Sequence, residues 1–245
     1  GNGTNTLTIT NYNANLASLI TDGSTAKTAV VMSPGGQNTP SFANANNTFS
    51  GGLTIGGGSS TRLWQGSVTN TLVNGTLTKS NFGTGTVYIG ANGSTGAAQL
   101  MLNSGSVYNN IIVNAATYSD GGSAAFRIEG TVAFYGTLTA GASDISLSNG
   151  SGTGSATAYG QLTGTNGLLL KTPSGSNTIT LTLANTANAA NNYSGNTTIS
   201  ANTTLALGAA NQIANGSGKG NLIINSGNFT MGGCSDTING LSGNG

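Results

Sequence analysis

Histidine is absent from this 245-residue chain, and charged residues make up only 4% of it, whereas an average soluble domain has about 25%. Without histidine the chain cannot form a Ser-His-Asp triad, a Cys-His pair or a histidine-ligated metal site. The single cysteine, Cys234, excludes an internal disulfide and every zinc site built on a CxxC motif. We interpret Cys234 as a small buried hydrophobe, with an intermolecular bridge or a reactive thiol as the alternative.

The chain also has few of the features that direct proteins to nucleic acids or membranes. Six basic and five acidic residues give a net charge of +1, so no basic stripe is available for nucleic acid. The apolar runs are far shorter than the about 20 residues that cross a bilayer, so we expect no membrane insertion. The first ten residues lack the basic and apolar regions of a signal peptide. We expect that such a peptide was removed or that the sequence begins inside a longer chain.

Short runs of alternating apolar and polar residues are the main positive feature of the sequence. Examples are TLTIT (6–10), GTVYIG (85–90) and TITLTLAN (178–185). Strict alternation over four to eight residues predicts half-buried strands, and the Asn-Gly, Ser-Gly and Gly-Gly steps between the runs predict tight turns. Residues 184–191 are the one stretch where we would tolerate a helical turn. The sequence therefore predicts an all-β protein.

Internal repetition distinguishes a solenoid from a sandwich or a barrel. NNTFSGGLTI (46–55) returns as NNYSGNTTI (191–199), and QLMLNSG (99–105) returns as NLIINSG (221–227). The two offsets differ, which is typical of a solenoid whose coils repeat while its turns vary in length. We predict one continuous parallel β-helix over residues 1–245, right-handed as parallel β connections generally are. At about 20–25 residues per coil it should contain roughly 10–12 coils.

The larger apolar residues of each alternating run are expected to face inward. These core candidates are Leu53, Ile55, Val87, Ile89, Leu100, Leu102, Ile179, Leu181, Leu205, Leu207, Ile223 and Phe229.

The repeated words resemble a known family, the autotransporter-associated β-strand repeat, also called the passenger-associated transport repeat. The resemblance is carried by GLLLKTPSGSNTITLTLANTANAANNYSGNTTISANTTLALG (167–208) and NLIINSGNFTMGGCSDTINGLSGNG (221–245). It extends over repeat-like units near 16–66 and 160–245, of which the first is more degenerate. The resemblance implies an exported, right-handed parallel β-helix within a very large surface protein. It supplies no catalytic residue, cofactor or metal.

One set of charged residues is a candidate catalytic cluster, because many parallel β-helices are enzymes that cleave glycans with two or three carboxylates on one face. Asp120, Arg127, Glu129 and Asp144 would lie on consecutive coils. The alternative is that Arg127 and Glu129 form a same-face pair on one strand, while Asp120 and Asp144 occupy turns. We favour this alternative and predict that the protein is not an enzyme.

Four other candidate sites are weaker. Asp22-Gly23, Asp120-Gly121 and Asp236 never recur in the frame of a calcium-binding β-roll, which favours ordinary Asx turns. Arg62 and Trp64 would stack on a sugar ring or cap the core at a coil corner, and we favour the cap. Asn-x-Ser/Thr sequons are expected from so Asn-rich a composition and indicate glycosylation only in a suitable host; examples are Asn46, Asn74, Asn149, Asn196 and Asn228. A flat ice-binding face requires a TxT motif that repeats at a fixed coil length. The sequence has no such repeat, which argues against ice binding.

The sequence thus predicts a secreted, non-catalytic structural protein of the cell surface or extracellular matrix, forming a β-solenoid stalk or fibre. The alternative is an adhesin or glycan-binding passenger module. The predicted partners are further copies or further repeats joined end to end, with surface glycans as the ligand in the alternative. Neither terminus carries a polar cap or a charged edge, which favours continuation into another solenoid segment.

Overall fold

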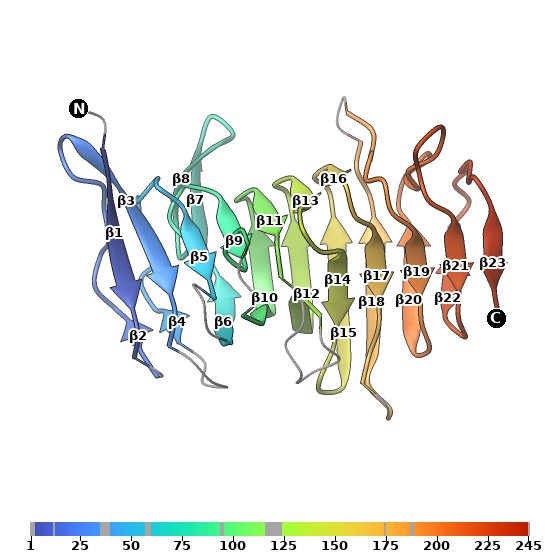
Figure 1. Cartoon of the computed structure of the whole chain (residues 1–245), viewed down its shortest axis with the longest axis horizontal. Helices are drawn as coiled ribbons and strands as arrows, with labels where there is room; N and C mark the ends of the chain where they lie inside the picture. Colours follow the sequence, from blue (N-terminus) through green and yellow to red (C-terminus); the bar gives the residue numbers. More distant parts are fainter. Residues whose placement is uncertain are drawn as a thin grey trace.

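Parallel strands stacked side by side form an elongated solenoid in the computed structural model of the chain (Figure 1). The structure describes residues 3–11, 13–34, 40–56, 60–93, 96–115, 124–173, 175–186 and 189–244. These ranges contain 23 strands and no helix, and the described part of 184–191 is not helical either. The predicted all-β parallel solenoid is confirmed.

One face of the solenoid is a seven-stranded parallel sheet. In spatial order it consists of β1 (Gly3–Ile9), β3 (Ala26–Met32), β5 (Leu53–Ile55), β9 (Val87–Ile89), β11 (Ile111–Val113), β13 (Leu138–Ala140) and β16 (Leu162–Gly164). Each strand of this sheet comes from the next coil of the chain, so neighbours in space are separated by one full turn.

The other faces belong to a twelve-stranded sheet that divides partway along the solenoid. Three long strands pair in the order β6 (Thr61–Val68), β10 (Ala98–Val107) and β12 (Phe126–Phe134). The first part of β12 leads to β14 (Ile145–Ser148), β17 (Leu168–Leu170), β19 (Thr197–Ile199), β21 (Leu222–Ile224) and β23 (Leu241–Gly243). Its second part leads to β15 (Thr153–Ala158), β18 (Thr178–Leu183), β20 (Thr203–Leu207) and β22 (Asn228–Thr230).

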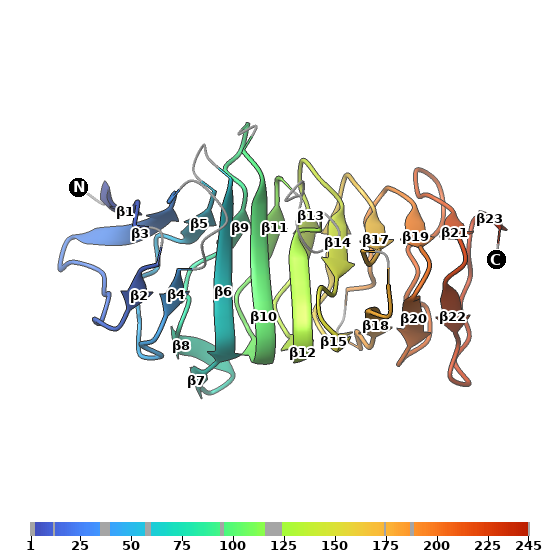
Figure 2. The same ribbon diagram turned by 90° about the horizontal axis from the view of Figure 1, so that it is seen from below.

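Two short pairs complete the set of strands. β2 (Asn15–Leu16) pairs with β4 (Ser41–Phe42) in parallel. β7 (Asn70–Val73) and β8 (Thr76–Ser80) form an antiparallel hairpin that projects from the solenoid (Figures 1 and 2). Its turn is Asn74-Gly75, whose φ angles of 50° and 79° fit the Asn-Gly turn that favours hairpins.

Insertions such as this hairpin are one reason why the coils are fewer than the sequence predicts. Paired strands β3 and β5 lie 23 residues apart (Val30 opposite Leu53), whereas β5 and β9 lie 34 apart (Leu53 opposite Val87). The described chain makes about 9 turns, so the prediction of 10–12 coils was wrong. Insertions lengthen individual turns without adding a rung to the stack.

Stacked aliphatic columns form the core. In the seven-stranded sheet one inward column runs Val30, Leu53, Val87, Ile111, Leu138 and Leu162, all at most 2% exposed. In the twelve-stranded sheet another runs Leu63, Leu100, Phe126, Leu147, Leu170 and Ile199. Ten of the twelve predicted core residues are buried, the exceptions being Ile223 and Phe229.

Ile223 was assigned to the wrong face. In β21 the buried residue is Leu222, and Ile224 packs against the core, so Ile223 between them faces outward. Its run, Leu-Ile-Ile, has large apolar residues at both parities, and size alone cannot choose between them. The matching segment QLMLNSG (99–105) resolves the ambiguity, because Ile223 aligns there with Met101, which also faces outward. Phe229 is half-buried and packs against the core from the last coils.

The segments NNTFSG (46–51) and NNYSG (191–195) resemble each other in sequence but not in position. Phe49 and Tyr193, the aligned aromatic residues, are both fully buried. The strands that follow them, β5 and β19, belong to different sheets. The word therefore encodes a buried aromatic corner before a short strand, and this corner is used on more than one face of the solenoid.

The first strand, β1, and the last strand, β23, lie at opposite ends of the solenoid (Figure 2). Leu7 of β1 is 39% exposed and Leu241 of β23 is 66% exposed. The two strands are also the terminal strands of their sheets, so one edge of each has no described strand beside it. Both ends therefore have the apolar surface and free ladder groups of an edge strand.

Candidate functional site

The proposed carboxylate cluster is only partly assembled. Arg127 and Glu129 form an ion pair on one strand, β12, as the non-catalytic alternative predicts. Glu129 Oε1 also accepts a hydrogen bond from the Gly150 amide at 3.2 Å. Asp144 precedes β14, and Ser148, opposite Arg127, lies four residues further, roughly 13 Å of extended chain. Asp120 lies outside the described residues, so its place relative to the others stays a prediction.

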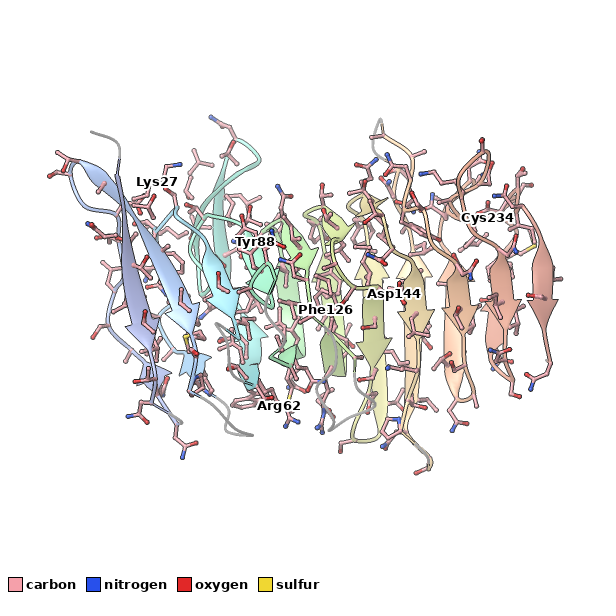
Figure 3. All side chains as sticks on the ribbon, viewed as in Figure 1. Lys27, Arg62, Tyr88, Phe126, Asp144 and Cys234 are labelled. Carbon is pink, nitrogen blue, oxygen red and sulfur yellow. The ribbon has the colours of Figure 1, made fainter. Side chains whose placement is uncertain are left out.

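Each described carboxylate holds backbone amides in place. Asp144 Oδ1 accepts from the Gly167 amide at 2.7 Å, one coil further on (Figure 3). Asp236 Oδ2 accepts from the amides of Gln212 and Ile213 at 2.6 and 2.9 Å. Such bonds to backbone N–H groups are charge-assisted and strong. These acidic side chains fix the turns of neighbouring coils.

Asp22 plays the same part near the N-terminal end. Its Oδ1 accepts from the Thr28 amide at 2.7 Å, and its Oδ2 accepts from Ser50 Oγ at 2.6 Å. Partial burial raises the pKa of Asp22, but the hydrogen bonds from Ser50 and Thr28 outweigh it and the pKa is lowered overall. The described residues hold no group of three or more His, Cys, Asp or Glu side chains that would bind a metal ion. The predicted Asx turns are not formed at Asp22 and Asp236, because Asp22 accepts from Thr28 and from Ser50 in the next coil, and Asp236 accepts from Gln212 and Ile213 in the preceding coil.

Side-chain amides join successive coils in a recurrent way. Three of them bond both the N–H and the C=O of a single residue in the neighbouring coil, at 2.8–3.1 Å: Gln65 with Phe42, Gln212 with Asn185, and Asn239 with Gly216. In this arrangement the amide imitates the next peptide of a β-ladder. These contacts join neighbouring coils where no strand ladder connects them.

Arg62 and Trp64 do not form the predicted core cap. Arg62 is buried and donates from Nε to Gln99 Oε1 at 3.0 Å (Figure 3). Trp64 is 39% exposed, and its ring packs beside Gly66 on the outside of β6. The alternation of β6 instead places Trp64 on the outer face.

A ladder of three tyrosines was not predicted. Tyr108, Tyr135 and Tyr159 follow the ends of β10, β12 and β15, and their rings stack with centroids 4.5 and 4.9 Å apart. Burial raises the pKa of Tyr135, and the two neighbouring tyrosines add to the rise. Their spacings of 27 and 24 residues match coil lengths elsewhere in the stack, as between Ile111 and Leu138 and between Leu138 and Leu162. That signal is readable only once the coil lengths are known.

Tyr193 is the most buried tyrosine of the described chain. Its hydroxyl lies 2.5 Å from Thr197 Oγ1 and is fully buried. Burial raises the pKa of Tyr193 to about 12, despite the hydrogen bond with Thr197. It therefore stays neutral throughout the physiological range and acts as a core residue with one satisfied polar group.

Among the sequons, Asn149 is excluded as a glycan acceptor by its surroundings. It is fully buried and donates from Nδ2 to the Ile128 carbonyl at 2.8 Å. Asn46, Asn74, Asn196 and Asn228 are exposed, so their glycosylation stays a prediction. Cys234 is half-buried and packs against the core, in agreement with the hydrophobe interpretation.

A shallow groove crosses the outer side of the seven-stranded sheet. It has a volume of ≈ 480 Å³ and is lined by Tyr88, Asn92, Ile112, Asn114, Gly141, Ala142 and Thr165. These residues come from β9, β11 and the turns that follow β9, β11, β13 and β16, so the groove runs across four neighbouring strands. No aspartate, glutamate, lysine or arginine is among the residues that line it. The groove combines an aromatic ring with the side-chain amides of two asparagines and the hydroxyl of a threonine.

Comparison with known proteins leaves the chain without an assigned family. No protein-family model matches it, and no curated protein or solved structure shows significant similarity to it. Within the described part of the chain, no helix is long and apolar enough to span a membrane.

Proposed function

We propose that the chain is a non-catalytic structural segment, a β-solenoid stalk or fibre of the cell surface or extracellular matrix. The observation that carries the proposal is the use of its polar side chains. The carboxylates of Asp22, Glu129, Asp144 and Asp236 all accept backbone amides, and the buried amide of Gln212 bonds a neighbouring coil. Groups that would do chemistry in an enzyme hold one coil to the next in this protein.

The stacked core supports the same proposal. Each coil contacts the coils before and after it, so a solenoid of this kind extends by adding rungs without any change in design. The resemblance to autotransporter-associated repeats supports export and a place at the cell surface. Under this proposal the stalk carries other modules away from the surface, and its resistance to unfolding is its contribution.

End-to-end contact is the partner relationship that we propose for the stalk. Leu7 and Leu241 are exposed on terminal strands, where another coil, from a second copy or from further repeats, would cover them. Stacking of unlike ends repeats without closing, and so produces filaments. The same exposed edges would make an isolated segment self-associate.

Electron microscopy and sedimentation of residues 1–245 test this proposal. We expect concentration-dependent association into rods longer than one solenoid, reduced in the double variant Leu7→Lys/Leu241→Lys, because charge on an edge strand opposes pairing. Leu72→Lys is the matched control, since Leu72 is 36% exposed on the lateral hairpin. A monodisperse monomer at every concentration, or equal association of the double variant and the wild type, would contradict the proposal.

A further inference from the structure

The groove over β9, β11, β13 and β16 has the chemistry of a carbohydrate site. Tyr88 and Ile112 lie opposite each other on adjacent strands and form the apolar part of the groove. Figure 3 labels Tyr88 beside β9, midway along the solenoid. An added Cβ at Gly52 would lie 3.3 Å from the Tyr88 ring, so the ring packs closely against the preceding coil. This contact with the glycine restrains the aromatic ring before any ligand arrives.

Polar groups line one side of this apolar patch, in the turns that follow β9, β11 and β16. Asn114 Nδ2 donates one hydrogen to the Gly90 carbonyl at 3.3 Å, and an amide nitrogen carries a second hydrogen. Thr165 Oγ1 donates to the Gly141 carbonyl at 3.1 Å, which leaves its own lone pairs available as acceptors. Asn92 and Thr165 are exposed. The groove thus offers an aromatic ring toward its β9 end, with donors and acceptors along the turns that follow the strands.

We propose that this groove binds a neutral polysaccharide, with a pyranose ring stacked on Tyr88. The polarised C–H groups of a sugar ring are attracted to the negative face of an aromatic ring. Sugar hydroxyls exchange hydrogen bonds with planar amides and with threonine. A charged sugar would require a charged partner when its carboxylate loses water, and the lining residues include none.

The direction of the groove indicates an extended chain rather than a single sugar. It crosses four adjacent strands, whose three intervals of about 4.8 Å give roughly 14 Å. The volume of ≈ 480 Å³ lies within the usual range for ligand sites. The bound polysaccharide would therefore lie along the axis of the solenoid. This site goes beyond the stalk function, and it does not depend on contact between the ends.

Affinity electrophoresis of the 245-residue chain tests the site, with barley β-glucan, xyloglucan, galactomannan or dextran in the gel and polygalacturonate as the charged comparison. We expect at least one neutral polymer to retard the protein, and Tyr88→Ala to weaken its dissociation constant at least 10-fold. Ala142→Trp fills the groove from an exposed position, and we expect an equal loss. This second variant keeps the test decisive if Tyr88→Ala does not fold.

Tyr159→Ala is the matched control, because it removes a tyrosine that is 42% exposed in the tyrosine ladder and outside the groove. It should bind as the wild type does. The site is refuted if none of the neutral polymers retards the protein, if only polygalacturonate does, or if the groove variants bind as well as Tyr159→Ala. None of these results would contradict the stalk proposal, because end-to-end association is measured in the absence of polysaccharide.

Discussion

Leu205→Ala is expected to lower the free energy of unfolding by about 2–5 kcal/mol, through lost burial and the cavity left behind. Leu205 is fully buried in β20, between Leu181 of β18 and Phe229 of β22. Neighbours in two coils lose contact at once, and a stacked core has little freedom to collapse around the gap. Urea denaturation followed by circular dichroism measures the change.

The control for this substitution is Thr204→Ala on the same strand. Thr204 alternates with buried Thr203 and Leu205 and is half-exposed on the outer face. Its replacement should cost less than about 1 kcal/mol, the range of strand propensities. If Leu205→Ala and Thr204→Ala had the same effect, the inward column at this position would be wrong.

Gln212→Leu is expected to lower the free energy of unfolding by about 2–4 kcal/mol. The side chain is 3% exposed, and it bonds both the N–H and the C=O of Asn185 at 2.9 Å. Leucine has nearly the same size but leaves these buried peptide groups without that partner, and each unsatisfied group costs about 1–3 kcal/mol. The same urea titration measures the loss.

Gln161→Leu controls for the general effect of replacing glutamine. Its Nε2 donates to the Ala190 carbonyl at 2.7 Å in an exposed position, where water can replace the amide. We expect a change below about 1 kcal/mol. Similar losses in the two variants would indicate that the amide contacts of Gln212 add nothing beyond ordinary surface bonds.

The fold was predictable from alternation because strand parity is a local property. Runs such as Leu53-Thr54-Ile55 have only one apolar parity, and the structure buries Leu53 and Ile55 as expected. The prediction was wrong where the pattern was ambiguous, at Ile223. Register between coils is not local, since it depends on where the chain makes an insertion such as the β7–β8 hairpin. The number of coils was therefore overestimated.

The candidate site was less predictable than the core. The Arg127–Glu129 pair follows from two same-parity residues on one strand, and it was predicted. The groove that includes Tyr88 is lined by residues from four coils. Which residues meet there depends on the strand register between coils, and a local sequence pattern does not predict that register. The tyrosine ladder has the same cause. Arg62 and Trp64 were read as a pair because they are close in sequence, yet one is buried and the other exposed.

We infer that aliphatic contacts and neutral amide bonds between successive coils supply most of the stability of this solenoid, and that the few carboxylate–amide bonds add a smaller part. Among the described residues four groups have shifted pKa values, namely Asp22, Tyr135, Lys171 and Tyr193, and we derive the expected pH range from the pKa values of Asp22 and Tyr193. The lowered pKa of Asp22 gives a contribution that is complete above pH 5 and lost as the pH falls below about 4. The raised pKa of Tyr193 gives a contribution that is complete below about pH 10 and lost as the pH rises through about 12. Neither contribution changes between about pH 5 and 9, and there is no histidine to titrate.

Thermal melting between pH 5 and 9, in NaCl from about 0.02 to 1 M, tests this claim most directly, because added salt screens charge interactions and leaves aliphatic contacts and neutral amide bonds in place. We predict that Tm changes by less than about 5 °C over the whole range. A fall of tens of degrees with salt or pH would contradict the account, since it would show that charges hold the coils together.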